Sequence, residues 1–269
     1  MTGATPGGAS FGSVTLPDTT KTIEVDGTAA GGGLGFALIG IGSFFGTPGG
    51  LVATATVAGA AYGFKAQSPV GGITTAGSAD DSIVGPTADQ YGATVGFLGP
   101  LGNSLGALTI GAPGGKYVDV NLGTAQTGPF LGPMGGAPAP SVRFTDTTSG
   151  NSFGVVNIGG GIGGTSQVTS FIGGDQIADL VVAGQGEALK PFYLINGARL
   201  AGMSGTIDVS VAQPGPVPAI VRVEGKFPSD WSTGFTEGAA IVDLNGDGYG
   251  DFAIGETVAS KPGRIAVFY

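Results

Sequence analysis

The chain has 269 residues, of which 56 are glycine and 17 are proline, and it contains neither cysteine nor histidine. The lack of cysteine excludes disulfides, zinc–thiolate centres and iron–sulfur clusters, and the lack of histidine removes the commonest general base and metal ligand. The net charge is -9 and only 11% of the residues are charged. Nucleic-acid binding is therefore not expected, because phosphate recognition needs clustered lysine and arginine.

The beginning of the chain shows no secretory signal. The first residues, MTGATPGGASFG, have neither a basic nor an apolar region. From Gly27 to Phe64 no residue is charged, but glycine and proline keep the apolar runs far shorter than the roughly 20 residues of a spanning helix. We expect buried strands here and no membrane span. An acidic, glycine-rich chain without cysteine is typical of proteins outside a bacterial cell, so we expect an extracellular or cell-surface location.

Short β-branched and aromatic runs, closed by glycine or a turn residue, predict many short strands and no long helix. Such strands are typical of a sandwich, a barrel or a propeller. In chain order the predicted strands cover residues 22–27, 35–42, 51–59, 81–85, 91–99, 106–113, 116–123, 141–146, 153–160, 179–184, 191–197, 206–213, 220–225, 238–244, 251–256 and 264–269.

An internal repeat favours the propeller. Each unit contains an aromatic–glycine pair, a glycine-rich strand, a loop and two apolar strands. A spacing of 20 residues separates Tyr91 from Gly111 and also Phe235 from Gly255, whereas 31 residues separate Phe153 from Gly184. The predicted repeats cover residues 20–70, 78–125, 140–200 and 218–269 of a single domain, and residues 1–19 provide an extra strand for closing the ring.

These motifs resemble the FG-GAP repeat, which builds the β-propeller of integrin α-chains and occurs in many secreted bacterial proteins. Tyr91-Gly92, Gly111-Ala112-Pro113, Phe153-Gly154 and Phe235 carry the resemblance. It implies an all-β, propeller-like fold of about four to five degenerate four-stranded blades. The integrin propeller has seven blades, so the ring is either small and closed or open and completed by another chain, because open strand edges invite pairing.

The segment IVDLNGDGYGDFAIGE contains the strongest candidate metal site. Asp243, Asn245 and Asp247 stand at alternate positions, Tyr249 offers its backbone carbonyl, and Asp251 completes the set. Calcium prefers such oxygen ligands. An EF-hand would need a glutamate where this chain has Ile254, and the following residues read as a strand, so we expect a calcium loop between two strands. The alternative is a solvated hairpin turn, since Asn-Gly and Asp-Gly are ordinary turn dipeptides.

The same loop is depleted of ligands in the other copies. The third copy keeps Asp175 and Asp179, with Phe171 and Gly173 in place of the first two ligands, and the first two copies have no carboxylates there. Whether the Asp175/Asp179 loop binds metal stays open. A single calcium site would therefore fix one long loop and neutralise its carboxylates.

Other acidic residues suggest a weaker alternative. Asp80, Asp81, Asp89 and Asp146 could form the carboxylate pair of a glycoside hydrolase, but nothing in the sequence brings them together and solvated loops at the blade edges explain them better. Trp231 is either an exposed ligand anchor or a packed corner residue. An enzyme is not expected without histidine and cysteine.

The sequence leaves two main functions open. One is a non-enzymatic, calcium-stabilised extracellular binding or adhesion module, which the resemblance implies. The other is a structural subunit that self-assembles into a filament, sheath or surface layer, which the low charge and the mean hydropathy of +0.32 favour. The partner is accordingly a protein or surface ligand, or other copies of the chain.

Overall fold

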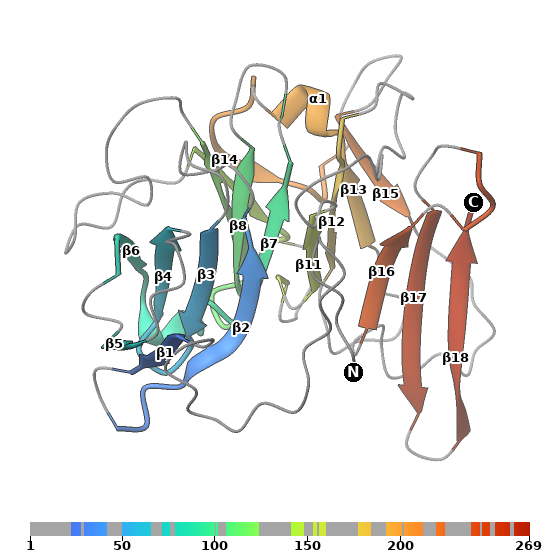
Figure 1. Ribbon diagram of the computed structural model, residues 1–269. Coiled ribbons are helices and arrows are strands. Elements are labelled where there is room, and N and C mark those ends of the chain that lie inside the picture. Colours follow the sequence, from blue (N-terminus) through green and yellow to red (C-terminus); the bar gives the residue numbers. More distant parts are fainter. Residues whose placement is uncertain are drawn as a thin grey trace.

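The computed structural model describes the strands, the turns that join them and a part of the loops (Figure 1). The described residues are 23–27, 30–41, 50–65, 72–75, 79–99, 101, 106–123, 141–147, 153–154, 156–159, 177–183, 192–200, 202–211, 219–223, 238–242, 244–247, 251–258 and 261–269.

Most described strands belong to four sheets. The first sheet contains β2 (Leu34–Gly40), β3 (Gly50–Ala55), β4 (Ala60–Lys65) and β6 (Asp81–Val84). The second sheet contains β7 (Thr94–Leu98), β8 (Ala107–Ala112), β9 (Tyr117–Leu122), β10 (Val142–Thr145) and β14 (Gly205–Asp208). The third sheet contains β11 (Val156–Gly159), β12 (Leu180–Ala183), β13 (Phe192–Ile195) and β15 (Ile220–Val223). The fourth sheet contains β16 (Gly238–Val242), β17 (Asp251–Val258) and β18 (Lys261–Phe268).

The remaining elements are small. Strands β1 (Ile23–Asp26) and β5 (Gly72–Thr75) form a parallel pair, and β14 also runs parallel to its neighbour β10. All other strand pairs within the four sheets are antiparallel. A 3-10 turn, η2 (Thr87–Asp89), precedes β7, and one short helix, α1 (Gly197–Leu200), follows β13.

Apart from β14, which returns to the second sheet after β13 of the third, the four sheets follow one another in chain order, from blue to red in Figure 1. Their first strands lie side by side: β2 packs against β7, β7 against β11, and β11 against β16. This row of first strands is the arrangement found around the axis of a propeller. Among the described elements the row ends at β2 on one side and at β16 on the other.

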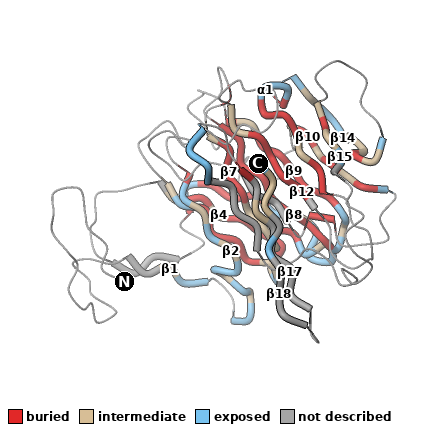
Figure 2. The backbone as a smooth tube through the Cα atoms, turned by 90° about the vertical axis from the view of Figure 1, so that its right-hand side faces the viewer, coloured by how far each residue is buried: buried red, intermediate tan, exposed pale blue. Residues whose placement is uncertain are grey.

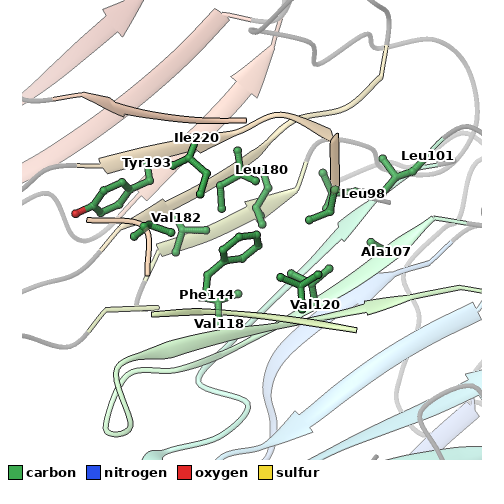
Figure 3. Close-up of a cluster of buried hydrophobic side chains, with 14 of the residues drawn as sticks. Leu98, Leu101, Ala107, Val118, Val120, Phe144, Leu180, Val182, Tyr193 and Ile220 are labelled. Carbon is green, nitrogen blue, oxygen red and sulfur yellow. The ribbon is translucent and has the colours of Figure 1, made fainter. Parts of the chain in front are cut away.

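Two hydrophobic clusters hold the first three sheets together. The cluster between the second and third sheets includes Phe144 and Val120 from one side and Leu180 and Val182 from the other (Figure 3). The cluster between the first and second sheets includes Val52 and Ile110. Strand β8 is buried along its whole length because both faces of the second sheet are covered, as the red tubes in Figure 2 show.

The all-β prediction is confirmed, whereas the number of blades and the repeat boundaries stay predictions. The sheets are offset by one strand from the predicted repeats. Strand β6 (Asp81–Val84) lies at the beginning of the predicted repeat 78–125, but in the structure it is the outer strand of the preceding sheet. Strands β4 and β5 lie outside the predicted strand ranges, and helix α1 was not predicted. The expected extra strand in residues 1–19 lies outside the described residues.

Candidate metal centre

The candidate calcium loop connects two antiparallel strands. Strand β16 ends at Val242, which lies opposite Asp251, the first residue of β17. The loop is therefore flanked by strands on both sides, as the sequence predicted, and not by the helices of an EF-hand. Three of the five predicted ligands are described, namely Asn245, Asp247 and Asp251, while Asp243 and Tyr249 lie outside the described residues.

Hydrogen bonds join the three candidate ligands that the structure describes. Asn245 Nδ2 donates to Asp247 Oδ2 at 2.9 Å, and the Asp247 amide donates to Asn245 Oδ1 at 2.9 Å. The buried carboxylate of Asp251 reaches back across the loop, where its Oδ2 accepts from the amides of Leu244 at 2.7 Å and Asn245 at 3.2 Å. Gly246 between them has φ +78, a left-handed conformation that glycine adopts without steric cost.

The chemistry of this donor set fits a hard cation. Carboxylate and amide oxygens gather in one tight loop, and residues 244–247 are exposed to solvent. The described part of the chain contains no cluster of three acidic side chains that could hold a metal ion. A full ligand set therefore requires Asp243, the carboxylate just before the described loop residues.

The corresponding carboxylate of the third copy has a structural partner. Asp179 is buried immediately before β12, and its Oδ1 accepts a hydrogen bond of 2.9 Å from the amide of Gly197, the first residue of α1. Asp175 lies outside the described residues. Asp179 thus ties the start of β12 to the helix that follows β13, a role that needs no metal ion.

The carboxylates considered for glycoside hydrolysis also serve the packing. The Tyr117 hydroxyl donates to Asp89 Oδ2 at 3.1 Å, and the Tyr193 hydroxyl donates to Asp146 Oδ2 at 2.7 Å. The pKa of Tyr193 is raised well above its ordinary value, first by burial and then by this hydrogen bond. Asp81 is buried and accepts from the amide of Ser82 at 2.8 Å. Asp81, Asp89 and Asp146 thus each accept a hydrogen bond from a different group. Trp231 lies outside the described residues.

An ion pair between β9 and β10 was not anticipated from the sequence. Asp119 and Arg143 lie opposite each other, and Arg143 donates from Nε at 2.6 Å and from Nη2 at 2.9 Å. The guanidinium also stacks 3.7 Å above the ring of Tyr117. Burial raises the pKa of Asp119, and the hydrogen bonds from Arg143 oppose that rise. The alternation of both strands is the signal that could have placed the pair on one face, but the register is not evident from sequence.

The glycines of the repeat motif form the contact between sheets. The carbonyl of Gly154 accepts a hydrogen bond of 2.8 Å from the Thr94 hydroxyl, so the third sheet is bonded directly to the second. A Cβ at Gly111 would overlap with that same carbonyl oxygen. A Cβ at Gly154, whose φ is +97, would lie 2.6 Å from the carbonyl oxygen of Tyr117. The first glycine of one repeat therefore packs on the second glycine of the preceding repeat.

The third sheet uses alanine at the place of Gly111. Gly111 lies opposite Thr94, three residues after Tyr91. In the third sheet Val156, three residues after Phe153, lies opposite Ala183. The position is thus occupied by Ala183 and not by Gly184, which the sequence spacing had suggested.

The fold and these contacts define an all-β protein of successive, mainly antiparallel sheets, of which the second and third meet at Gly111 and Gly154. Residues 235–268, which include the whole fourth sheet and its loop, match the FG-GAP repeat family. FG-GAP repeats generally occur in binding or adhesion modules and are typically non-enzymatic. No curated protein matches the chain. None of the helices in the described part of the chain has the length and apolar character that crossing a membrane requires.

Proposed function

We propose that this chain is a non-enzymatic binding or adhesion module, stabilised by calcium, that acts outside the cell or at its surface. The observation that carries the proposal is the loop between β16 and β17, where Asn245, Asp247 and Asp251 are drawn together by hydrogen bonds. The FG-GAP match over the same residues supports it, because such repeats generally belong to binding modules.

The ion would be held by the side chains of Asp243, Asn245, Asp247 and Asp251 together with the carbonyl of Tyr249. Bound calcium would supply positive charge that neutralises the three carboxylates. The residues themselves already prepare the loop: Asp251 fixes its first turn through two amides, and Asn245 and Asp247 brace each other.

A role in binding, with no chemical step, is supported by what the other carboxylates do. Asp89 and Asp146 each accept a tyrosine hydroxyl, and Asp179 accepts a backbone amide. The chain also lacks histidine and cysteine, which most proton-transfer and nucleophilic schemes use. The partner is accordingly a protein or a surface ligand that stays unchanged on binding.

Thermal unfolding in calcium and in chelator tests the proposal. A ligand present at 100 times its Kd stabilises the folded state by about 2.7 kcal/mol. For a chain of this size such a gain raises Tm by roughly 5–10 °C. We expect this increase for the wild type and for Asp26→Ala, which removes an exposed carboxylate from β1. We expect Asp247→Ala to lose the increase while melting close to wild type in chelator. Equal calcium responses of Asp247→Ala and Asp26→Ala would refute the site.

A further inference from the structure

The two ends of the row of sheets each leave one apolar face exposed. Within the row, the second sheet is covered on both sides: Leu108 and Ile110 pack toward the first sheet, and Val118 and Val120 pack toward the third. Among the described strands, no further sheet of the row precedes the first sheet or follows the fourth, and the parallel pair of β1 and β5 is not part of the row. What covers these two outer faces is the question that the arrangement raises.

The outer face of the first sheet is exposed in part: it carries large apolar side chains, while the outward-pointing Ala53, Ala55 and Ala60 are buried. Because Val52 and Ala61 point into the cluster shared with the second sheet, the residues that alternate with them point outward. Leu38 is 60% exposed and Leu51 is 38% exposed, and Leu51 lies opposite Phe64. We call this surface the first face, and it consists of Leu38, Leu51, Phe64 and Val84.

The outer face of the fourth sheet lies on β18. The ring of Phe268 packs edge-on against Phe192 of the third sheet, with their centroids 5.3 Å apart. The residues that alternate with Phe268 therefore point away from the third sheet. Ile265 is 76% exposed, and Tyr269 at the end of the strand is exposed as well. We call this surface the last face, and it consists of Ile265, Val267 and Tyr269.

The residue pairing across neighbouring strands shows that the two faces correspond to the two surfaces that meet between neighbouring sheets within the chain. In the first sheet Leu51 lies opposite Phe64. This pair occupies the position that Leu108 and Asn121 occupy in the second sheet. Leu108 is fully buried against the first sheet. Thus the first face has the pattern that a sheet uses to pack on the sheet before it.

The last face has the complementary pattern. In the second sheet the Gly111 position lies opposite Val118, and in the fourth sheet the corresponding Gly255 lies opposite Ile265. Val118 is fully buried against the third sheet, whereas Ile265 is largely exposed. The edge of β18 differs from its counterparts too, because β4, β9 and β13 each pair with a further strand, while β18 has no such neighbour among the described strands.

We propose that the first face of one copy packs on the last face of a second copy, so that the row of sheets continues from chain to chain. Each face matches the partner that the other supplies, and within one chain both stay exposed at opposite ends of the row. Such a contact is heterologous, because different surfaces meet, and it builds either a closed ring of copies or an open filament. This inference goes beyond the binding role and does not depend on the calcium loop.

Light scattering on variants with one blocked face tests the head-to-tail contact. Leu38→Asp blocks the first face, Ile265→Asp blocks the last face, and Val211→Asp is the control because Val211 is 59% exposed but belongs to neither face. We expect assemblies for the wild type and the control, and monomers for each blocked variant alone. An equimolar mixture of the two blocked variants should give a dimer of twice the monomer mass, since each retains the face that the other lacks.

Several results would overturn the proposal. A wild type that is monomeric both in calcium and in chelator would do so, as would blocked variants that keep the mass of the wild type or a mixture that stays monomeric. Assembly in chelator with no calcium response would leave this proposal standing and sink only the calcium site. Conversely, a calcium-stabilised monomer would sink only the assembly.

Cross-linking identifies the contacting surfaces directly. The chain has no cysteine, so introduced cysteines report without background. Because sheets packed face to face lie about 10 Å apart, too far for most disulfides, a thiol-specific bifunctional cross-linker of about that length is the suitable probe. We expect it to join Leu38→Cys chains to Ile265→Cys chains in a mixture. Cross-links only between identical variants, or only within a chain that carries both cysteines, would contradict a head-to-tail contact between copies.

Discussion

The contact between Gly111 and Gly154 makes a sharp prediction for Gly111→Ala. A Cβ at Gly111 would lie closer than 3.0 Å to both the Gly154 carbonyl oxygen and Thr94 Oγ1. The threonine side chain can rotate away, but the carbonyl belongs to the backbone of the third sheet. The sheets must therefore separate, and the hydrogen bond of 2.8 Å between Thr94 and Gly154 is strained or lost.

The cost follows from these two effects. Overpacking of a close contact costs about 1–3 kcal/mol. Loss of a hydrogen bond adds about 0.5–1.5 kcal/mol. The sum is about 2–4 kcal/mol, which for a chain of this size lowers Tm by roughly 5–15 °C.

Thermal unfolding followed by circular dichroism measures the loss, with Gly99→Ala as the matched control. Gly99 lies just after β7, and a Cβ there meets nothing within 4 Å. Gly99→Ala should leave Tm unchanged or raise it slightly. Alanine lowers the conformational entropy of the unfolded chain, which stabilises the folded state by about 0.4–1 kcal/mol. Thr94→Ala added to Gly111→Ala should not restore stability, since the backbone overlap remains. If Gly111→Ala and Gly99→Ala melt alike, the glycine contact does not hold the sheets together.

Three further predictions concern buried and bonded side chains. Asp251→Ala should destabilise the protein by about 1–3 kcal/mol even in chelator, because the amides of Leu244 and Asn245 lose their acceptor. Urea unfolding measures this loss, and a variant as stable as the wild type in chelator would contradict the prediction. Tyr193→Phe should cost about 1–3 kcal/mol, because it removes a hydroxyl donor from the buried carboxylate of Asp146; an unchanged urea midpoint would show that the bond is unimportant. Burial raises the pKa of Asp208, but hydrogen bonds from Ser210 and Thr147 outweigh it and hold that pKa below its ordinary value. Asp208→Asn should therefore destabilise at neutral pH. This cost should fade as the pH falls below the ordinary aspartate pKa of about 3.9, because a lowered folded-state pKa contributes its full stability above the unfolded value and loses it as the pH falls through the folded value. A cost that stays constant from neutral to acid pH would contradict the assignment.

The strands were predictable because their signal is local. The run KYVDVNLG becomes β9 (Tyr117–Leu122), and SVRFTD becomes β10 (Val142–Thr145). The pairing of strands distant in sequence was not predictable, since β1 with β5 and β10 with β14 are parallel pairs that no periodicity specifies. Helix α1 is a single turn between two strands, too short to show a helical period.

The candidate site shows the same division between local and distant information. The spacing of Asn245, Asp247 and Asp251 along the chain was sufficient to bring them into one loop, because the loop is short. The pairing of Asp119 with Arg143 depends on the register of two strands, and the sequence does not fix that register. The repeat spacing singled out Gly111 and Gly154, but only the structure shows that one glycine packs on the other.

The exposure of Ile265 illustrates what a single chain leaves unfinished. Its counterpart Val118 is covered by the third sheet, and the sequence of β18 gives no sign that its own cover is missing. Alternation of apolar residues predicts that a face will be buried, but it does not predict what buries it. The two end faces could therefore be recognised only once the order of the sheets was known.

Calorimetric titration of the full chain with calcium tests the central claim most directly. Among the four predicted repeats, the sequence keeps the full set of proposed oxygen ligands in the loop between β16 and β17 alone. The account therefore predicts one calcium ion per chain, with binding abolished in Asp247→Ala and retained in Asp26→Ala. Absence of binding to the wild type, or binding that Asp247→Ala leaves intact, would contradict the account.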